Sequence, residues 1–493
     1  MYSRPNILVV MTDQQRGDTA LPGHPLNLPH LNRFAEQGLR FTSAWCPSPH
    51  CCPSRNTFFT GLYPSEHGVW NNVLVEQALQ RTLRPGVRMW SEDLAEAGYD
   101  LHFAGKWHVS AMEHPKDRGW QELADVSETS QAESSTRWSL YTDLAANGHD
   151  TRRSPGQILR PGWPPIQVYG TMADDAIDRD DLRVKAAIDC LSDKRNSPTP
   201  WGLYVGLSAP HDPYFARREF LDRVPENPPL PPSFGDSLEG RPGIYRRLRE
   251  QIFGQLPEQE WRQVIRHYWA CCLQIDDAFG RILAALEATG QADNTLVVFC
   301  SDHGDYLGDH GLLCKGIPCF TGAYHIPAVV RWPKGIRQPG RTVSELVSLA
   351  DFAPTFLEVA GVKSPGPTTG RSLMPFLRAE PAPVDWRDAV FTQCNGVELY
   401  YTQRSVRTKD WVYVYNGFDL DELYDLNRDP HQTHNLASDP TFTPIVQALC
   451  GRMWRFARET HDTIINPYWT VGLAPFGPAT AFSDQPTRSP APA

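Results

Sequence analysis

A cysteine in an unusual local setting is the first candidate for chemistry in this chain. Cys51 opens the segment CCPSRNTFFTG, and Pro53 follows it closely. A proline followed by helix-compatible residues predicts that Cys51 lies at or just before a helix N-terminus. There the free backbone amides and the helix dipole favour an anion, which lowers the pKa of a thiol. The residues alone therefore make Cys51 a candidate nucleophile, with a buried structural thiol as the alternative.

Two dipeptides, Asp13-Gln14 and Asp302-His303, could together hold a metal ion. They offer three oxygen-donor side chains and one imidazole. Such a set suits a divalent cation such as Ca²⁺, Mg²⁺ or Mn²⁺ better than thiolate-type zinc coordination. Either dipeptide taken alone could equally be a solvated loop or a helix cap. The two dipeptides would form a metal site only if the fold brings them together.

A set of cationic and imidazole side chains could hold an anionic substrate. Its members are Arg55, Lys106, His108, His211 and Lys315. Arg55 lies one helical turn after Cys51 and can point back toward it. Lys106 and His108 stand two positions apart, so they share a face where the backbone is extended. A single Lys or His is ordinarily a surface charge or a satisfied polar residue, so a shared role requires elements that bring these side chains together.

Five short apolar runs predict the strands that position these side chains. The runs lack polar alternation, as expected of strands that are buried on both faces. They cover residues 6–12, 101–105, 202–208, 295–301 and 328–332. Helical spacing occurs between them, most clearly over residues 259–287. Strands alternating with helices predict an α/β fold in which helices cover both faces of a parallel sheet.

Polar clusters follow four of these strands directly. In strand order they are Asp13 and Gln14, then Lys106 and His108, then His211, then Asp302 and His303. In an open α/β sheet, ligands bind beyond the carboxyl ends of the strands. We therefore expect the four clusters to converge on one site.

The cysteine segment resembles the signature of the sulfatase family. The matching positions are Cys51, Pro53, Ser54, Arg55, Phe59, Thr60 and Gly61. Only Cys51, and not Cys52, places the proline and the arginine correctly. Further similar stretches extend the resemblance over residues 6–437. It implies an alkaline-phosphatase-like α/β fold: a mostly parallel sheet covered by helices on both faces, with a smaller C-terminal antiparallel-sheet subdomain.

The resemblance also implies roles for the candidate residues. A formylglycine-generating maturation enzyme would oxidise Cys51, and one divalent cation would activate the product. The implied metal ligands are Asp13, Gln14, Asp302 and His303. The implied catalytic residues are Cys51, Arg55, Lys106, His108, His211 and Lys315. Asn72 matches by spacing a substrate-contacting asparagine of phosphonate monoester hydrolases.

Gln14 and His303 depart from the commoner sulfatase pattern, which has a second Asp and an Asn at these positions. They are similar to the replacements found in phosphonate monoester hydrolases and choline sulfatases. We favour Ca²⁺ as the metal, while the imidazole shifts preference toward Mn²⁺ and Mg²⁺ stays open.

These features predict a sulfatase that hydrolyses a small-molecule sulfate ester to an alcohol and inorganic sulfate. A phosphonate monoester or phosphodiester hydrolase on the same fold is the alternative, favoured by Gln14 and His303. The Pro53-Ser54 form of the signature and the Lys106/His108 pair favour the sulfatase. A metal- or anion-binding protein without activity is a third hypothesis, and the complete candidate set argues against it.

The organisation of the chain predicts a catalytic α/β domain over residues 1–379 and a C-terminal α+β subdomain over 380–466. In the subdomain we expect strands at 398–407, 411–415 and 422–426, closed by a helix at 444–459. Residues 467–493 are rich in Pro, Ala and Thr and predict a tail or arm, which leaves a homo-oligomer possible. Residues 127–165 are mostly polar and predict a lid or substrate loop.

Composition excludes several partner classes. The 493 residues carry a formal charge of -10, which gives no general reason to bind nucleic acid or an anionic membrane. The sequence has no apolar run of the roughly 18–20 residues that span a bilayer. The N-terminal apolar run, residues 7–11, is too short for a signal-peptide core, which predicts a cytoplasmic protein. The 11 cysteines are irregularly spaced, so we expect no disulfide framework, and we expect Cys271 and Cys272 to be core thiols.

Overall fold

The structure, a computed structural model, describes residues 4–123, 138–147, 152–195, 197–363, 366, 368–396 and 399–482. Parts of the predicted lid, the start of the predicted strand 398–407 and tail residues 483–493 lie outside these ranges.

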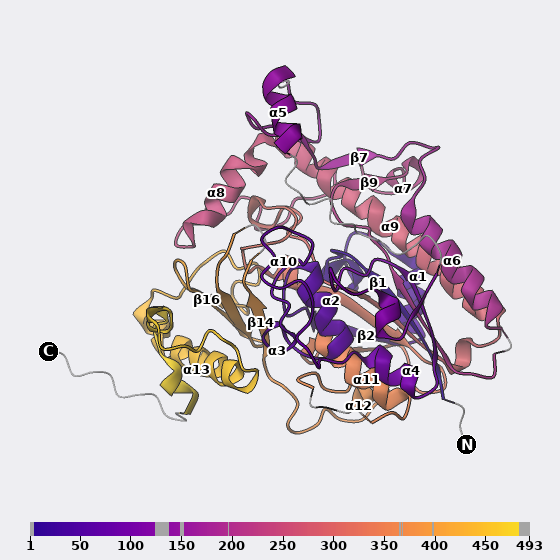
Figure 1. Cartoon of the computed structure of the whole chain (residues 1–493). Coiled ribbons are helices and arrows are strands. Elements are labelled where there is room, and N and C mark those ends of the chain that lie inside the picture. The colour runs from indigo at the N-terminus through magenta and orange to yellow at the C-terminus, as the bar shows by residue number, and fades with distance from the viewer. Residues whose placement is uncertain are drawn as a thin grey trace.

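A nine-stranded sheet runs through the larger part of the molecule (Figure 1). From one edge to the other its strands are β12 (Arg341–Val343), β2 (Leu39–Trp45), β11 (His325–Arg331), β10 (Thr295–Ser301), β1 (Asn6–Thr12), β8 (Trp201–Gly206), β3 (Asp100–Gly105) and β4 (Gln121–Glu122), with β13 (Val347–Ser348) also paired to β2. Only β11 runs antiparallel to its two neighbours, β10 and β2, among the pairs of this sheet. The predicted mostly parallel sheet is therefore confirmed.

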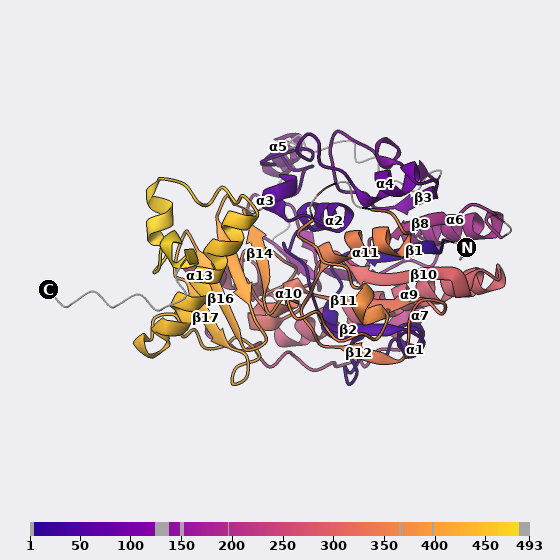
Figure 2. The same cartoon turned by 90° about the horizontal axis from the view of Figure 1, so that it is seen from below.

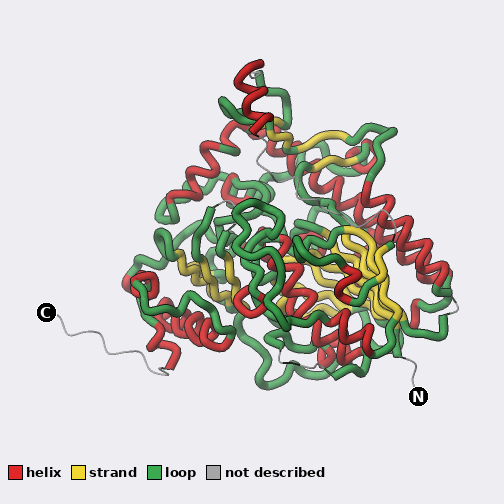
Figure 3. Tube along the Cα trace, in the orientation of Figure 1, coloured by secondary structure: helices red, strands yellow, loops and turns green. Residues whose placement is uncertain are grey.

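Both faces of the sheet are buried because each central strand sends alternate side chains into two different cores. In β1, Ile7 and Val9 enter one core while Leu8 and Val10 enter the other. The first core is covered by α2 (Cys51–Thr60), α4 (Trp90–Glu96) and α11 (Phe352–Val359), and the second by α1 (Pro29–Glu36), α6 (Arg179–Asp193) and α9 (Glu258–Ala288). Figure 3 shows the strands between these helical layers. The predicted helix 259–287 is α9, and its Cys271 and Cys272 are buried in the second core.

Several of the described strands were not predicted, among them β2 and β14 (Val390–Cys394). β2 carries Thr42 and Ser43 among its apolar residues, so it lacks the continuous apolar run of the other central strands. β14 is short and ends in polar residues. The predicted strand 328–332 begins earlier, at His325, because β11 pairs with Trp45 from its first residue.

A second sheet forms the C-terminal part of the molecule, beside the α/β core (Figure 2). Its order is β14, β15 (Gln403–Arg407), β16 (Trp411–Asn416) and β17 (Glu422–Asp425), all antiparallel. The helix α13 (Thr443–Glu459) packs on it. Described residues of the predicted tail contact this helix, where Trp454 Nε1 donates to the Phe476 carbonyl at 2.7 Å. The predicted boundaries near residues 379 and 466 stay predictions.

The remaining elements connect these layers. The shorter helices are α3 (Pro64–His67), α5 (Trp138–Asn147), α7 (Arg218–Leu221), α8 (Gly243–Gln251), α10 (Thr321–Tyr324) and α12 (Met374–Leu377). Two small sheets pair β5 (Gln157–Ile158) with β6 (Ile166–Gln167), and β7 (Tyr169–Thr171) with β9 (Tyr214–Ala216). Among the described helices, none combines the length and apolar character that a membrane crossing requires.

Candidate active site

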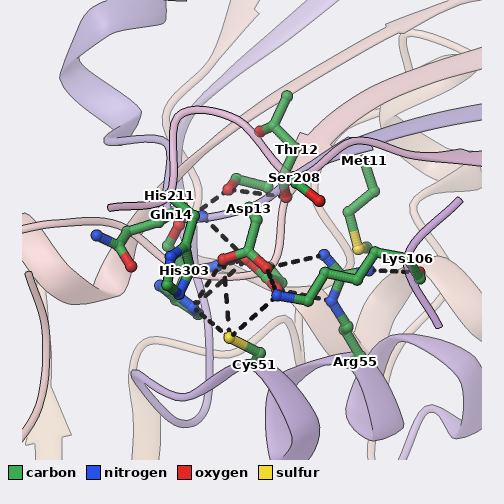
Figure 4. A network of polar contacts seen from close by, with 12 residues as sticks. Met11, Thr12, Asp13, Gln14, Cys51, Arg55, Lys106, Ser208, His211 and His303 are labelled. Atoms are coloured by element: carbon green, nitrogen blue, oxygen red, sulfur yellow. Dashed lines mark hydrogen bonds and ion pairs between the residues drawn. The ribbon is translucent and has the colours of Figure 1, made fainter. Parts of the chain in front are cut away.

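Cys51 is the first residue of α2, as the proline after it predicts. Its side chain is buried, with 1% of the residue exposed. The Cys51 Sγ lies 3.3 Å from His303 Nε2, 3.7 Å from Asp13 Oδ1 and 3.9 Å from Lys106 Nζ (Figure 4). These three partners follow β10, β1 and β3, so the polar clusters at the strand ends do converge on the predicted nucleophile.

Two buried carboxylates stand beside Cys51, and each has one oxygen occupied by a cationic side chain. Asp13 Oδ2 lies 2.5 Å from Lys106 Nζ and 3.3 Å from Arg55 Nη2. Asp302 Oδ2 lies 2.8 Å from Arg55 Nε. The other oxygen of each carboxylate, Oδ1, lies 3.5 Å (Asp13) or 3.6 Å (Asp302) from His303 Nε2. The two Oδ1 atoms therefore face a common point.

His303 completes a donor set that suits a divalent cation. Its Nδ1 lies 3.0 Å from the Gly304 carbonyl, which can only accept, so Nδ1 donates there and Nε2 faces the two carboxylates. One donor atom from each of Asp13, Cys51, Asp302 and His303 lies within 4.8 Å of the others. Two carboxylate oxygens and an imidazole nitrogen fit a cation such as Ca²⁺, Mn²⁺ or Mg²⁺.

The charges around Cys51 favour an anion at this position. Burial raises the pKa of the Cys51 thiol, but Lys106 and Lys315 together with the other positive groups lower it well below its ordinary value. Burial and Cys51 also raise the pKa of Asp13, and there the cations Lys106, His211 and Arg55 prevail and lower it. The site therefore favours the charged forms of Asp13 and Cys51.

Arg55 links the two carboxylates. It has no exposed surface. Besides Asp13 and Asp302, it donates to the Lys106 carbonyl at 2.9 Å and to Tyr204 Oη at 3.1 Å. It points back toward Cys51 as predicted, and its guanidinium is held by four acceptors of the protein.

Gln14, Lys315 and His211 form a second group beside the first. Lys315 Nζ lies 2.5 Å from Gln14 Oε1 and 2.7 Å from His211 Nε2. The Gln14 Nε2 donates to Asp305 at 2.6 Å and to Asp212 at 3.0 Å. Figure 4 shows the Gln14 amide on the His211 side of the site and directed away from Cys51. Gln14 therefore contacts Lys315 through its side-chain oxygen and two carboxylates through its NH₂ group.

The two remaining candidates lie close to Cys51. Burial, followed by the charge of Lys106, lowers the pKa of the His108 imidazole. Its Nδ1 is buried and has no hydrogen-bond partner among the described residues. Asn72 Oδ1 accepts from the backbone amide of Cys52 at 3.1 Å, so Asn72 lies at the start of α2.

Close approach of two glycines brings Lys106 into place. Gly105 ends β3 with φ of 102°, and a Cβ there would lie 2.1 Å from the Gly206 carbonyl oxygen. Glycine alone tolerates both the conformation and the contact. The Lys106 amide consequently donates to the Gly206 carbonyl at 3.0 Å, which directs the lysine from the end of β3 toward Asp13.

Comparison with protein families decides the assignment. A family model described as Sulfatase matches residues 5–362, which include all the candidate site residues. The chain belongs to the sulfatase family. A second model, described as N-sulphoglucosamine sulphohydrolase, C-terminal, matches residues 308–459. Membership confirms the predicted family and its enzyme class, the sulfuric ester hydrolases.

Known relatives of this sulfatase cover nearly its whole length. Arylsulfatase K of Danio rerio is 29% identical over 476 residues, covering 91% of this chain and 83% of the relative. A choline-sulfatase of Rhizobium meliloti is 28% identical over 468 residues, covering 90% and 84%. Among solved structures, a phosphonate monoester hydrolase of Agrobacterium radiobacter has a TM-score of 0.75 at 22% identity, covering 93% of this chain and 96% of the other. These similarities confirm the predicted alkaline-phosphatase-like fold.

Three residues of the site of this sulfatase were not predicted: Tyr204, Asp212 and Tyr214. Tyr204 lies within an apolar strand, and only its hydroxyl group reaches Arg55. Asp212 directly follows His211 and Tyr214 lies three residues after it, so their position in the segment PHDPY was the available signal. Tyr214 Oη donates to Asp305 at 2.6 Å, and Asp305 has no exposed surface.

Proposed function

We propose that this sulfatase hydrolyses a small sulfate monoester to an alcohol and inorganic sulfate through a formylglycine made from Cys51. The observation that supports this most is the setting of Cys51, whose sulfur lies within 3.9 Å of Asp13, Lys106 and His303. A formylglycine-generating enzyme would be the maturation partner. Hydrated formylglycine supplies two hydroxyl groups on one carbon, which a thiol does not.

Asp13, Asp302 and His303 would hold one divalent cation, with Gln14 as the proposed fourth ligand through Oε1. We favour Ca²⁺, with Mn²⁺ and Mg²⁺ as alternatives. When bound, such a cation lowers the pKa of a neighbouring hydroxyl group and balances negative charge on the ester. Lys106 and Arg55 would hold the second oxygen of each carboxylate, which keeps the Oδ1 atoms directed at the cation.

The cationic side chains would stabilise the charge that redistributes over the sulfonyl oxygens. Lys106 and Lys315 carry this charge next to Cys51, where burial makes each electrostatic interaction stronger than in water. Both keep their protons, because Asp13 and Cys51 raise the pKa of each lysine although burial lowers it. The positive charge of Arg55 would add to this electrostatic stabilisation of the sulfonyl oxygens.

Two groups would move protons. Lys315 Nζ and His211 Nε2 lie 2.7 Å apart, so either can pass a proton to the leaving oxygen. His108 would accept a proton from residue 51, because the lowered pKa of its imidazole leaves it neutral beside that residue. Asn72 would contact the substrate from the start of α2.

A phosphonate monoester or phosphodiester hydrolase is the second candidate function. Gln14 and His303 favour it, since they resemble the metal residues of that branch. Lys106 favours the sulfate ester, because the phosphonate branch generally lacks this lysine. The two reactions need the same in-line geometry, so we expect some activity on both substrates.

A paired turnover assay tests the proposal. The matured protein and the Cys51→Ala variant would be given an aryl sulfate and the matching aryl phosphonate monoester. We expect a clear preference for the sulfate and its loss in the variant. A preference for the phosphonate would make the second function the right one, and turnover retained by Cys51→Ala would exclude both. Mass spectrometry of the peptide that contains Cys51 would separately detect formylglycine, which a mere binding protein does not need.

A further inference from the structure

The side-chain amide of Gln14 can adopt two orientations, and only one of them serves the site. The oxygen of a glutamine amide accepts and its NH₂ group donates, so the atom that faces the active site decides whether Gln14 attracts or repels a cation. Gln14 Nε2 lies 2.6 Å from Asp305 Oδ2 and 3.0 Å from Asp212 Oδ1. Ionised carboxylates only accept hydrogen bonds, so the NH₂ group must face them. The oxygen consequently faces Lys315 Nζ, 2.5 Å away.

Asp305 is the more firmly held of these two carboxylates. It has no exposed surface, whereas the side chain of Asp212 is 35% exposed. Tyr214 Oη donates to Asp305 Oδ2 at 2.6 Å, and the Leu307 backbone amide donates to Oδ1 at 2.7 Å. Both oxygens of Asp305 therefore meet donors, and a backbone N–H cannot become an acceptor.

The surroundings hold the main chain of Gln14 as firmly as its side chain. The residue has a positive φ of 68°, which is unusual for a residue other than glycine. Tyr268 Oη donates to the Gln14 carbonyl at 2.7 Å, and the Gln14 amide donates to Asp302 Oδ1 at 3.2 Å. The ring of Tyr268 in turn packs edge-on against Tyr214 at a centroid distance of 5.3 Å.

We infer that Asp305, held by Tyr214, is a positioning residue that turns the oxygen of Gln14 toward Lys315. The importance of this orientation for metal binding rests on the proposed function, whereas the orientation itself rests on the contacts alone. With Gln14 turned the other way, its NH₂ group would face the Lys315 ammonium group, and no oxygen would be available to a metal.

The isosteric variant Asp305→Asn tests the inference, because it keeps the shape and changes one acceptor into a donor. The new NH₂ group must face either the Leu307 N–H or the Gln14 and Tyr214 donors, so Gln14 is expected to turn over. Protein stripped of metal would be titrated with Ca²⁺ or Mn²⁺ in a calorimeter. We expect the dissociation constant to rise about tenfold or more, the range seen when partners of metal ligands are changed.

The chain supplies a matched control in Asp421. This half-buried carboxylate accepts from Tyr413 Oη at 2.6 Å and from the Asn416 backbone amide at 2.8 Å, as the fully buried Asp305 does from Tyr214 and Leu307. Asp421 lies directly before β17, outside the active site. Asp421→Asn should therefore lower the Tm as Asp305→Asn does and leave the metal dissociation constant unchanged.

A second variant separates positioning from a loss of stability. In the double variant that combines Gln14→Glu with Asp305→Asn, the new carboxylate can accept from the introduced asparagine amide. Its other oxygen can then face Lys315, so metal affinity should recover. Equal metal affinity of Asp305→Asn and Asp421→Asn would overturn the inference, as would an absence of recovery in the double variant.

A crystal structure of Asp305→Asn provides a readout that needs neither metal nor ester. We expect Lys315 Nζ to leave the side chain of Gln14. A contact retained at hydrogen-bond distance would overturn the inference, whatever the substrate of the enzyme. Conversely, a chain without sulfate ester turnover would refute the proposed function while both the titration and the crystal structure still test Asp305.

Discussion

At the scale of single residues, the site depends on how four charged groups share oxygen atoms. Lys106 and Arg55 occupy the Oδ2 atoms of Asp13 and Asp302, which leaves the Oδ1 atoms directed at His303. Four buried charges in contact are stable only while each retains its partners. Loss of one partner should therefore affect both stability and catalysis.

Arg55→Lys tests this sharing. Lysine keeps the charge and cannot reach all four acceptors of the guanidinium group. We expect kcat to fall at least about 100-fold and stability to fall by about 3 kcal/mol, as for other broken buried ion pairs.

Arg404→Lys is the control for this variant. Arg404 is also buried and pairs with Asp462 in the C-terminal subdomain. Its replacement should cost similar stability and leave kcat within about threefold. Equal kcat losses in the two variants would show that Arg55 acts through stability alone.

Removal of metal is a second test at this scale. The Oδ1 atoms of Asp13 and Asp302 both lie near His303 Nε2, so a cation bound there should stabilise the folded chain by mass action, about 2.7 kcal/mol at 100 times its dissociation constant. We expect a chelator to lower the Tm measured by calorimetry and added Ca²⁺ or Mn²⁺ to restore it. An unchanged Tm, in protein shown by elemental analysis to have lost its metal, would argue against a metal at Asp13 and Asp302.

At the scale of elements, the C-terminal sheet holds the loop that carries Lys315. Gln403, in β15, donates through Nε2 to the Ile317 carbonyl at 2.8 Å, two residues after Lys315. Gln432 accepts from the Thr321 amide at 2.8 Å at the far end of the same loop. The subdomain is therefore part of the active-site framework and not an appended module.

Gln403→Met tests this connection. The methionine keeps the volume and leaves the Ile317 carbonyl without its donor, so Lys315 should lose its fixed position. We expect kcat/KM to fall about tenfold, since small displacements of catalytic groups reduce turnover. Gln393→Met is the control, because Gln393 is equally buried in β14 and bonds to Ser65 and Asp462. A similar fall of kcat/KM in both variants would contradict the assignment.

The sequence predicted which residues meet at the site, but it did not predict the hydrogen bonds that orient them. Asp13, Lys106 and Asp302 could be expected to meet because parallel strands end at one edge of a sheet. The orientation of the Gln14 amide could not, because it depends on Asp305, 291 residues away. β2 was missed for a related reason: its polar Thr42 and Ser43 are tolerated by tertiary pairing that no local pattern reveals.

At the scale of the whole molecule, the stability of the fold depends on pH through a buried histidine that resists protonation. His67, at the end of α3, has no exposed surface, and burial lowers the pKa of its imidazole from 6.5 to about 3. Its Nδ1 accepts from the Val69 amide at 3.1 Å. An unfolded chain binds a proton at His67 below pH 6.5, while the folded chain does not until about pH 3.

Acid should therefore destabilise the fold through His67. Because the folded pKa is depressed, the stabilisation is complete above the unfolded pKa and is lost as the pH falls, by about 1.4 kcal/mol per pH unit. We expect His67→Gln to make the dependence of stability on pH between 6 and 4 shallower by about that slope. Urea unfolding at several pH values measures it, with the exposed His434→Gln as control. Identical slopes for the wild type and His67→Gln would exclude this contribution.

The burial of Cys51 also has a consequence for the order of events in the life of the chain. All ten residues of α2 are buried, so a protein-sized catalyst has no path to the sulfur once the fold has closed. If another enzyme oxidises Cys51, it must act while residues 51–61 are still an accessible peptide, before folding is complete. Whether a given molecule ever becomes active is then decided during its synthesis. A copy that folds first stays inactive until it is unfolded.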